Sequence, residues 1–236
     1  MTPWEQVETH AMTYIKNDLP LDADLRNRPP VFYNRMERYM RAAIPRFNRP
    51  PFMAAKLAKY TAPRFTDAIY TADGTETQIA DVAKAVIPSG VTGYDICCAA
   101  RITQDRYGDT AMEYLTVTDY DSATGDITLA ANLEAGDTIE LDFYASGSFE
   151  QTLNDTEIDI LAFAIYAVWE KRFDNDAIER QSKIRDSSFT TISEASQTNA
   201  GTARQTAVDN QLFQMIRMYE QNYAYGKVVN KLGIFR

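Results

Sequence analysis

Apolar residues between positions 154 and 174 recur every three or four residues, which is the pattern of an amphipathic helix. Asn154 or Asp155 can cap its first turn, and Glu157 can complete a capping box. The continuous apolar face needs a partner, because burying each large side chain contributes on the order of 1.5–3 kcal/mol. We therefore expect this helix to be the centre of a helical bundle. Its predicted core positions are Ile158, Leu161, Ile165, Val168 and Trp169.

Helical spacing continues towards both ends of the chain. The N-terminal pattern predicts a helix from residue 2 to about 17, a polar connection over 22–28, a helix over 32–43 ended by Pro45, and a short helical piece over 51–59. The C-terminal pattern predicts a polar helix over 174–186, a Ser/Thr/Asn-rich connection over 187–201 and a long helix from about 203, with Gly226 as its C-cap. Both ends of the chain are thus expected to be helical.

Between these helical parts the period of the pattern changes from 3.6 to 2. Alternating runs cover 94–102, 113–118, 126–130 and 138–144, and they are separated by turn pairs such as Thr124-Gly125 and Ala135-Gly136. Regular short strands of this kind predict a small antiparallel sandwich or barrel. The predicted fold class is therefore α+β, with a helical bundle built from the N- and C-terminal segments and an antiparallel β-sandwich or barrel domain inserted between them.

The charge distribution follows the same division. Residues 1–64 carry a net charge of +5, residues 65–150 carry −13, and residues 151–236 carry −1, for a total of −9. A block as acidic as 65–150 is unsuited to holding a phosphate backbone, whereas the N-terminal segment suits an acidic partner. We therefore divide the chain into an N-terminal helical segment (1–64), a β insert (65–150), a C-terminal helical bundle (151–226) and a C-terminal tail (227–236).

Neither a membrane span nor a secretion signal is evident in the sequence. The first ten residues lack a basic start and a hydrophobic run, and no stretch approaches the roughly 18–20 apolar residues of a transmembrane helix. Cys97 and Cys98 are adjacent, so they match neither an ordinary disulfide nor a C-x-x-C site. We expect a soluble protein that is synthesised in a cytoplasm and carries no structural disulfide.

Candidate catalytic chemistry is sparse. His10 is the only histidine, which removes most catalytic triads and most zinc sites. Glu157 and Asp159 are two residues apart on a helix and point in different directions, so the helix dipole explains them without acid–base catalysis. The sequence contains no Gly-rich phosphate loop or nucleophile elbow. We therefore expect no enzyme activity, no catalytic residue, no cofactor and no bound metal.

One acidic cluster allows two interpretations. Asp119, Asp121 and Asp126 lie around Gly125 and could supply oxygen ligands to calcium. The same residues are those that a β-hairpin turn requires, and this interpretation is preferred.

The last ten residues combine apolar and basic side chains without an acidic one. Such a segment is too apolar for an ordinary solvated terminus and too short to form a stable helix alone. We expect it to dock on a partner or a neighbouring subunit rather than fold back on its own bundle. The predicted binding residues are Lys227, Val228, Val229, Lys231, Leu232, Ile234, Phe235 and Arg236.

Two separated stretches resemble the neck, or head–tail connector, proteins of tailed bacteriophages. The first, residues 32–51, is FYNRMERYMRAAIPRFNRPP, an amphipathic helix that ends in an Ala-Ile-Pro-Arg-Phe turn. The second, residues 153–196, begins LNDTEIDILAFAIYAVWEKR and ends DSSFTTISEAS. In the second stretch the spacing of Phe189, Ser193 and Ala195 is similar to that in the family. Together the stretches cover over a quarter of the chain.

The resemblance implies an adaptor in the virion. Proteins of this kind form a ring, usually dodecameric, below the portal and above the next neck or tail component, and they leave a channel through which the genome DNA passes without specific binding. The same resemblance implies that the C-terminal segment docks on the portal. Two alternatives remain open at this point: a tail, baseplate or decorating virion protein whose β domain faces outward, and a non-viral glycan-binding β-sandwich module.

Overall fold

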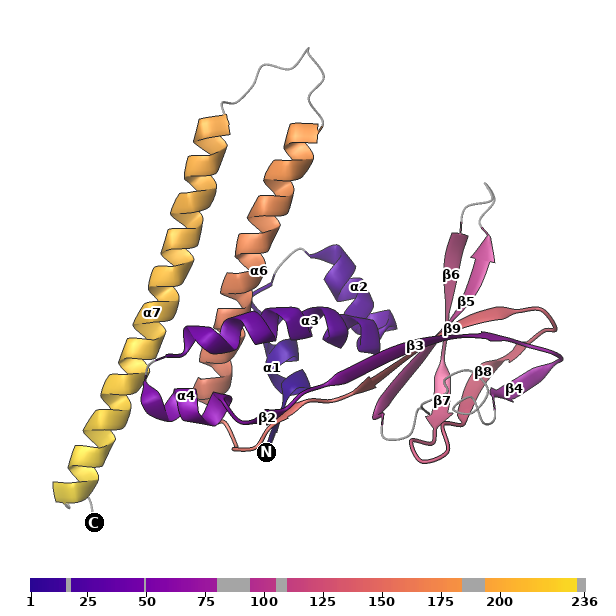
Figure 1. The fold of residues 1–236 in the computed structure, drawn as a ribbon, viewed down its shortest axis with the longest axis horizontal. Helices are drawn as coiled ribbons and strands as arrows, with labels where there is room; N and C mark the ends of the chain where they lie inside the picture. The colour runs from indigo at the N-terminus through magenta and orange to yellow at the C-terminus, as the bar shows by residue number, and fades with distance from the viewer. Residues whose placement is uncertain (16–17, 49, 80–93, 105–109, 184–193, 233–236) are drawn as a thin grey trace.

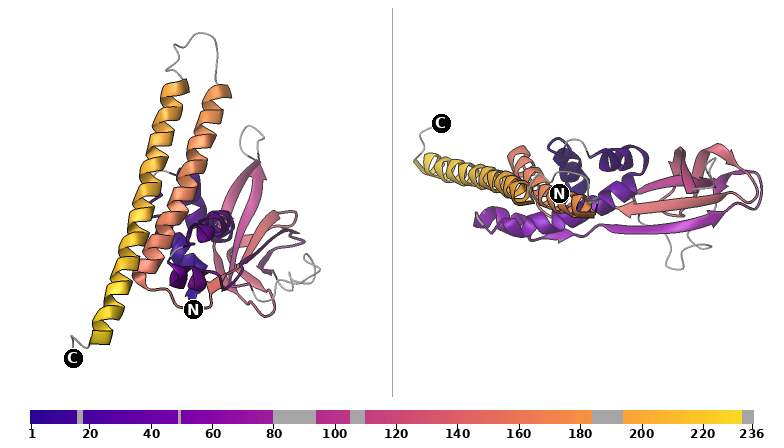
Figure 2. Two further views of the ribbon diagram at one scale, coloured as in Figure 1. Left: turned by 60° about the vertical axis from the view of Figure 1, so that its left-hand side comes forward. Right: turned by 90° about the horizontal axis from the view of Figure 1, so that it is seen from above.

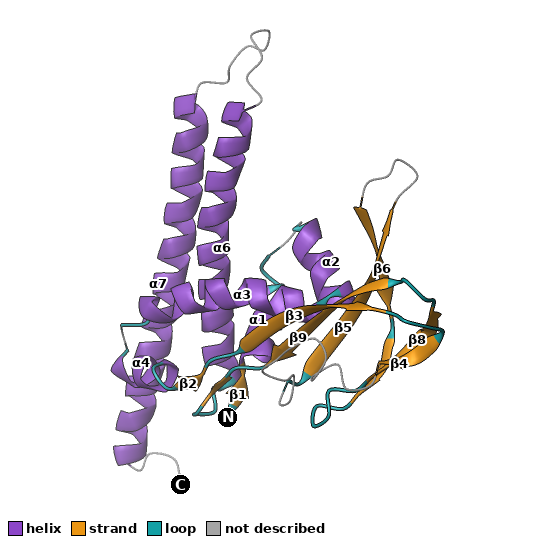
Figure 3. Ribbon diagram, turned by 45° about the vertical axis from the view of Figure 1, so that its right-hand side comes forward, coloured by secondary structure: helices purple, strands orange, loops and turns teal. Residues whose placement is uncertain are grey.

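A computed structural model describes residues 1–15, 18–48, 50–79, 94–104, 110–183 and 194–232. In this part of the chain there are six α-helices, a short 3-10 helix and three antiparallel sheets, which together form a mixed α and β structure. Figure 1 shows the helices at one end of the long axis and two of the sheets at the other. Figure 3 separates the same two parts by colour.

The helical region is built from both ends of the chain. It contains α1 (Trp4–Ala11), α2 (Leu19–Asn27), α3 (Pro29–Ala43), η1 (Ile44–Arg46), α4 (Pro51–Leu57), α6 (Asp155–Lys183) and α7 (Glu194–Leu232). α6 contacts α1, α3 and α7, so the helix predicted around residues 154–174 lies at the centre of this region. The apolar cluster that these helices enclose includes Met36, Met40, Leu161 and Ile165, all fully buried.

Four predictions about the helices were wrong. Residues 22–28 were expected to be a polar connection, but residues 19–27 form α2, because the Asp18 side chain accepts a hydrogen bond from the Leu21 amide and Leu21 packs in the core. The single predicted helix over 2–17 is correspondingly shorter, ending at Ala11.

The other two corrections concern α6 and α7. α6 is one helix of 29 residues that continues through position 174 rather than two helices, and α7 begins at Glu194 and continues through Gly226 to Leu232. No proline interrupts α7, and a glycine inside a helix costs only about 1 kcal/mol. Gly226 is therefore not a C-cap in this structure. The remainder of the predicted 187–201 connection lies outside the described residues.

The β region consists of two sheets packed around a separate apolar core. One has the strand order β3-β9-β5-β6, and the other β4-β8-β7. Their bounds are β3 (Arg64–Thr71), β4 (Glu76–Ile79), β5 (Ile96–Gln104), β6 (Thr110–Leu115), β7 (Val117–Tyr120), β8 (Ile127–Leu133) and β9 (Thr138–Ala145). Ile127, Leu129, Ile139, Leu141 and Phe143 are buried between the sheets. The sheets of the described residues do not close into a barrel, so that part of the prediction was wrong.

A third, small sheet joins the N-terminal end of the chain to the two segments that run between the helical region and the β region. It has the order β1-β10-β2, formed by β1 (Thr2–Pro3), β10 (Ser148–Phe149) and β2 (Tyr60–Thr61). A Cβ atom on Gly147 would lie 2.7 Å from Cδ of Pro63, so only glycine fits at this close approach of two backbones. Gly125 and Gly136 have φ values of 83° and 94° in the predicted turns, which confirms their turn roles.

Candidate functional site

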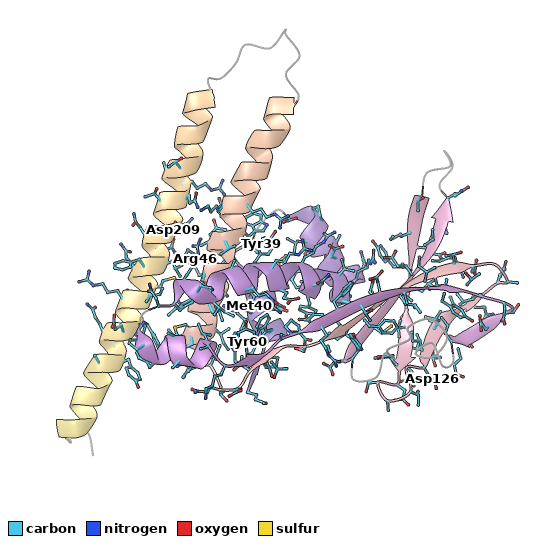
Figure 4. All side chains as sticks on the ribbon, viewed as in Figure 1. Tyr39, Met40, Arg46, Tyr60, Asp126 and Asp209 are labelled. Atoms are coloured by element: carbon cyan, nitrogen blue, oxygen red, sulfur yellow. The ribbon has the colours of Figure 1, made fainter. Side chains whose placement is uncertain are left out.

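α7 forms the outer edge of the helical region and contacts it at several positions along its length. Arg46 Nη1 lies 2.9 Å from Asp209 Oδ1, and Figure 4 shows this contact between η1 and α7. Further along α7, Leu212 is buried and the Tyr223 ring stacks on Phe52 with centroids 3.8 Å apart. One face of α7 is therefore committed to its own chain, and the opposite face is not.

The opposite face of α7 is exposed and almost uncharged. Phe213 and Met218 flank it, and each side chain is 63% exposed. Between them, at helical spacing, lie Thr206, Ala207, Asn210, Gln214, Arg217, Gln221 and Ala224, all of them exposed. We call this set of residues the outer face of α7. Exposed aromatic and methionine side chains with few charges are typical of protein interfaces rather than of a solvated surface.

The C-terminal end of α7 extends beyond α4 and away from the rest of the molecule (Figure 1). The predicted docking residues up to Leu232 belong to this helix rather than to a separate tail. The side chains after Ala224 and residues 233–236 lie outside the described residues. The structure therefore gives the backbone position of Lys227, Val228, Val229, Lys231 and Leu232 but not their contacts.

The predicted core positions of α6 face the other helices. Leu161 and Ile165 are fully buried, Ile158 and Trp169 are 6% and 5% exposed, and Val168 is half-buried. The Trp169 indole Nε1 donates a hydrogen bond to Asp18 Oδ2 at 2.9 Å. This bond ties α6 to the start of α2.

The first turn of α6 holds a buried carboxylate, Glu157, with several partners. Lys56 Nζ lies 2.7 and 2.8 Å from its two oxygens, and the Tyr219 hydroxyl donates to Oε1 at 2.7 Å. The Asn154 amide donates to Oε2 and the Glu157 amide donates to Asn154 Oδ1, which is the predicted capping box. Burial alone would raise the pKa of Glu157, but these hydrogen bonds outweigh it and lower the pKa. Glu157 thus joins α4, α6 and α7.

His10 and Asp159 form a second link, between α1 and α6. His10 Nε2 is 3.0 Å from Asp159 Oδ1, and the Tyr14 hydroxyl donates to the same oxygen at 2.5 Å. Burial would raise the pKa of Asp159, yet the hydrogen bonds from Tyr14 and His10 lower it overall. The His10 side chain is 41% exposed. This arrangement stabilises the contact between the two helices.

A second buried glutamate, Glu8, lies where α1, α3 and β9 meet. Its side chain is fully buried, and neither carboxyl oxygen has a hydrogen-bond partner among the described residues. Burial first, and then the charges of Glu37 and Glu5, raise the pKa of Glu8 well above its ordinary value. The Tyr33 and Tyr144 rings stack beside it with centroids 5.3 Å apart. Glu8 therefore remains a neutral acid at pH values at which an ordinary glutamate is ionised.

Arg28 connects the helical region to the β region. It lies between α2 and α3, and its Nη2 is 2.5 Å from Asp142 Oδ2 and 2.6 Å from Glu140 Oε1 on β9. Burial would lower the pKa of the guanidinium, but these hydrogen bonds outweigh it and raise the pKa. The Arg28 side chain is 12% exposed and that of Asp142 only 2%, so this ion pair is largely shielded from water. No local pattern predicts this ion pair, because Arg28 and Asp142 are over 100 positions apart.

The outer face of the β3-β9-β5-β6 sheet exposes apolar side chains at its two edges, whereas Ala100 in its middle is buried and Arg28 lies against Glu140 and Met112. Cross-strand pairing puts Ile69, Glu140, Ala100 and Tyr114 in one row across all four strands, and Met112 lies two residues from Tyr114 on the same face. Ile69, Met112 and Tyr114 are 59%, 40% and 46% exposed. We call these three residues the sheet patch. It lies on the opposite side of the sheet from the β core.

The remaining candidates are structural. Asp121 Oδ1 accepts a hydrogen bond from the Ala123 amide, which lowers the pKa of Asp121 and fits the hairpin turn. Among the described residues, no group of three His, Cys, Asp or Glu side chains is placed to hold a metal ion. Burial raises the pKa of both Cys97 and Cys98, which makes each a poor nucleophile. In the described part of the chain, no helix combines the length and the apolar character that a membrane span needs.

Comparison with protein-family models, with curated proteins and with solved structures found no match. The candidate functional surfaces are therefore assigned from the residues alone: the outer face of α7, its projecting C-terminal end and the sheet patch. The sequence pointed to the C-terminal end only. Phe213 and Met218 were not predicted because they lie outside the apolar stripe of α7. The sheet patch was not predicted because an alternating pattern of apolar and polar residues does not show which face of a sheet is covered.

Proposed function

We propose that this protein is a structural component of the head–tail junction of a tailed bacteriophage. It is an adaptor subunit that binds the portal and contributes to a ring around the DNA channel. In this role its helical region is a bundle built from both ends of the chain, and the β region is a sandwich-like domain inserted between them. The protein acts by binding other virion proteins and has no enzymatic role.

The packing of α3 on α6 carries this proposal. The two stretches that resemble neck proteins are separated in sequence by the whole β region, yet α3 from the first stretch contacts α6 from the second. Met40 of α3 and Leu161 of α6 belong to the same apolar cluster. The resemblance is thus limited to segments that pack together. This supports the proposal that α3 and α6 belong to one structural unit of the neck-protein type, to which the β region has been added.

The charge of the β region also supports the role. Residues 65–150 carry 16 acidic against 3 basic residues. Carboxylates at or near a DNA channel repel the phosphate backbone, which lets DNA pass without sticking. Tight binding of DNA by the isolated protein would contradict this part of the proposal.

The projecting end of α7 is the proposed portal-docking element. The end of α7 extends past α4, and the segment 227–236 carries five apolar and three basic residues but no acidic one. Apolar side chains that enter a groove, with cations that meet acidic walls, are a common mode of helix recognition.

Attachment to the portal protein of the same virus tests the proposal. The full chain is expected to form a ring on the portal that is visible in negative-stain images. Deletion of residues 227–236 should leave the melting temperature nearly unchanged and abolish attachment. A variant that replaces only Lys227, Lys231 and Arg236 with Gln separates charge from apolar contact, and it should attach more weakly. A truncated chain that melts markedly earlier, or that still attaches normally, would show that this segment does not dock.

A further inference from the structure

The sheet β3-β9-β5-β6 ends in two strands that pair on one side only. In the described part of the chain, β3 pairs with β9 alone and β6 with β5 alone. The sheet β4-β8-β7 also has two edge strands, but each has only four residues and is interrupted by a register shift. Short, irregular edges of that kind oppose pairing with another chain. β3 and β6 instead have eight and six residues, and each pairs with its neighbour in an unbroken register.

We propose that β6 of one copy of this chain pairs with β3 of the next copy, so that the sheet continues from subunit to subunit. The strand directions suit this pairing, because neighbouring strands of the sheet are antiparallel and β6 therefore runs opposite to β3. The proposal rests on the assembly role proposed above and names the contact between its subunits. The two edges belong to different strands, so the contact is heterologous and produces a ring when the rotation closes. Figure 2 shows the β region extending away from α6 and α7 in both views, so these long helices do not cover the sheet edges.

The main-chain groups of Ile69 on β3 point to one free edge of the sheet. Just past β3, the Ala72 amide donates to Asp137 O at 2.9 Å, and the Gly136 amide donates to Ala72 O at 2.8 Å, so Ala72 bonds to the β9 side. Hydrogen-bonded and non-hydrogen-bonded positions alternate along an antiparallel pair, and Ile69 is three positions from Ala72. The N–H and C=O of Ile69 are therefore directed away from β9, where another strand can bond to them.

The same alternation places the main-chain groups of Tyr114 at the opposite edge. Glu140 is the partner of Ile69 on β9, so its own main-chain groups bond to Ala100 on β5 rather than to β3. Ala100 thus uses its N–H and C=O towards β9, which leaves those of Tyr114, its partner on β6, directed away from β5. Ile69 and Tyr114 lie in one row of the sheet, and each offers a main-chain donor and acceptor to the next copy. Such main-chain hydrogen bonds supply the affinity when a strand is added to a sheet edge.

The side chains fit the same register. With Tyr114 opposite Ile69 of the next copy, an aromatic and a β-branched side chain that are 46% and 59% exposed would cover each other. Glu113, the only carboxylate of β6, would lie opposite Tyr70, and Asp67, the only carboxylate of β3, would lie past the end of β6. No two carboxylates would therefore face each other across the contact. The two apolar edges lie apart within one chain and come together only between copies.

Cross-linking of cysteine variants tests the pairing and its register. Hydrogen-bonded partners on antiparallel strands have Cα atoms about 5.5 Å apart, which suits a disulfide bond. Ile69→Cys and Tyr114→Cys are made separately in the full-length protein, and both positions are exposed, so circular dichroism and melting should be unchanged. Ser122→Cys, in the exposed turn between β7 and β8, is the matched control. Cys97 and Cys98 stay in every variant, and the unmodified chain measures the background that they cause.

Under mild oxidation, an equimolar mixture of Ile69→Cys and Tyr114→Cys should give a covalent dimer of twice the 26.7 kDa chain mass on a non-reducing gel. Each variant alone, and either one mixed with Ser122→Cys, should give no more dimer than the unmodified chain. A chain that carries both substitutions should give a ladder of trimers and larger species, because a heterologous contact repeats from copy to copy.

Ile69→Lys tests the same contact without a cross-link. A lysine on an edge strand opposes pairing with another chain. Light scattering over a range of concentrations should therefore show Kd for self-association raised by a factor of at least about ten. Ser122→Lys adds the same charge away from both edges and should leave Kd unchanged.

Three results would overturn the proposal: a mixture without covalent dimer although maleimide labels both thiols, single variants that cross-link as readily as the mixture, or equal cross-linking of Ser122→Cys. The second result would indicate symmetric pairing of like edges, and the third would indicate random collision. Attachment to the portal is scored separately. If the chain forms a ring on the portal but the mixture does not cross-link, the strand contact is wrong and the proposed function remains. If the mixture cross-links as expected but the chain never attaches to a portal, the contact is right and the proposed function is wrong.

Discussion

Glu157 and Glu8 are both fully buried glutamates of the helical region, and they differ in their hydrogen-bond partners and in the direction of their pKa shifts. Glu157 begins α6 and accepts hydrogen bonds from Lys56, Tyr219 and its own capping box. Glu8 lies at the junction with the β region, where no described residue donates to its oxygens. As a result the pKa of Glu157 is lowered, whereas that of Glu8 is raised well above its ordinary value.

The difference shows that burial alone does not determine the charge of a carboxyl group. Burial raises the pKa of both residues, and only the partners at Glu157 reverse the effect. Glu157 joins three helices through charged hydrogen bonds, whereas no described residue donates a hydrogen bond that would offset the burial of Glu8. The following predictions test this contrast, first the expected losses from the largest to the smallest and then one gain.

A carboxylate introduced into the core without a hydrogen-bond or ion-pair partner should cause the largest loss of stability. Ile165→Asp puts a charge at a fully buried position of α6 and should reduce the free energy of unfolding by several kcal/mol, enough to unfold the helical region. Trp4 and Trp169, the two tryptophans of the chain, both lie in the helical core, so tryptophan fluorescence measures the loss directly. Lys171→Asp, exposed on the same helix, should change stability by no more than about 0.5 kcal/mol. A normally folded Ile165→Asp variant would contradict the assignment of this core.

Removing the cation beside Glu157 should have the next largest effect. Lys56→Met leaves a fully buried carboxylate without its charged partner, so we expect a loss of about 3 kcal/mol in urea denaturation at pH 7. Glu157→Gln instead leaves an ammonium group that is one-quarter exposed, and Gln preserves the capping box, so the loss should be only about 1–2 kcal/mol. Equal losses in the two variants would mean that the carboxylate is not the costly member of the pair.

The pH dependence of Glu157 should be the reverse of that of Glu8. Because the folded pKa of Glu157 is lowered, its contribution is present above the unfolded value of 4.5 and is lost as the pH falls through the folded pKa. Glu157→Gln should therefore flatten the stability curve on the acidic side. An unchanged acid slope, measured by denaturation between pH 3 and 6 and compared with exposed Glu220→Gln, would count against an ionised Glu157.

The only gain is expected for Glu8→Gln, and it should grow with pH. The folded pKa of Glu8 is raised, so the wild-type protein is most stable below the unfolded value of 4.5 and loses stability as the pH rises through the folded pKa. Gln does not titrate, so the variant should lack this loss and gain about 1.4 kcal/mol relative to the wild type for each pH unit traversed before the folded pKa is reached. Parallel stability curves between pH 5 and 9 would show that Glu8 has an ordinary pKa.

Several local features could be predicted from the sequence because neighbouring residues determine them. The helix around 154–174, its capping box and the turns at Gly125 and Gly136 all depend on residues within four positions of one another. The division into helical and alternating parts also follows from local periodicity. Prediction failed where local signals compete. The sequence of α2 is polar and indicates a connection, but Leu21 packs in the core and stabilises a helix. Gly226 indicates a C-cap, but α7 contains no proline and continues through it.

The sequence alone thus determined the division into helical and β parts, how the charge is divided, and where several helices and turns begin or end, because periodicity, caps and turns are short-range. Only the tertiary structure decided that Lys56 and Tyr219 meet at Glu157, that Arg28 pairs with Asp142, and that Glu8 is buried without a partner. It also decided which apolar residues of α7 and of the sheet remain exposed. These properties depend on contacts between residues 60–150 positions apart, and the order of residues along a single chain does not encode them in any local pattern.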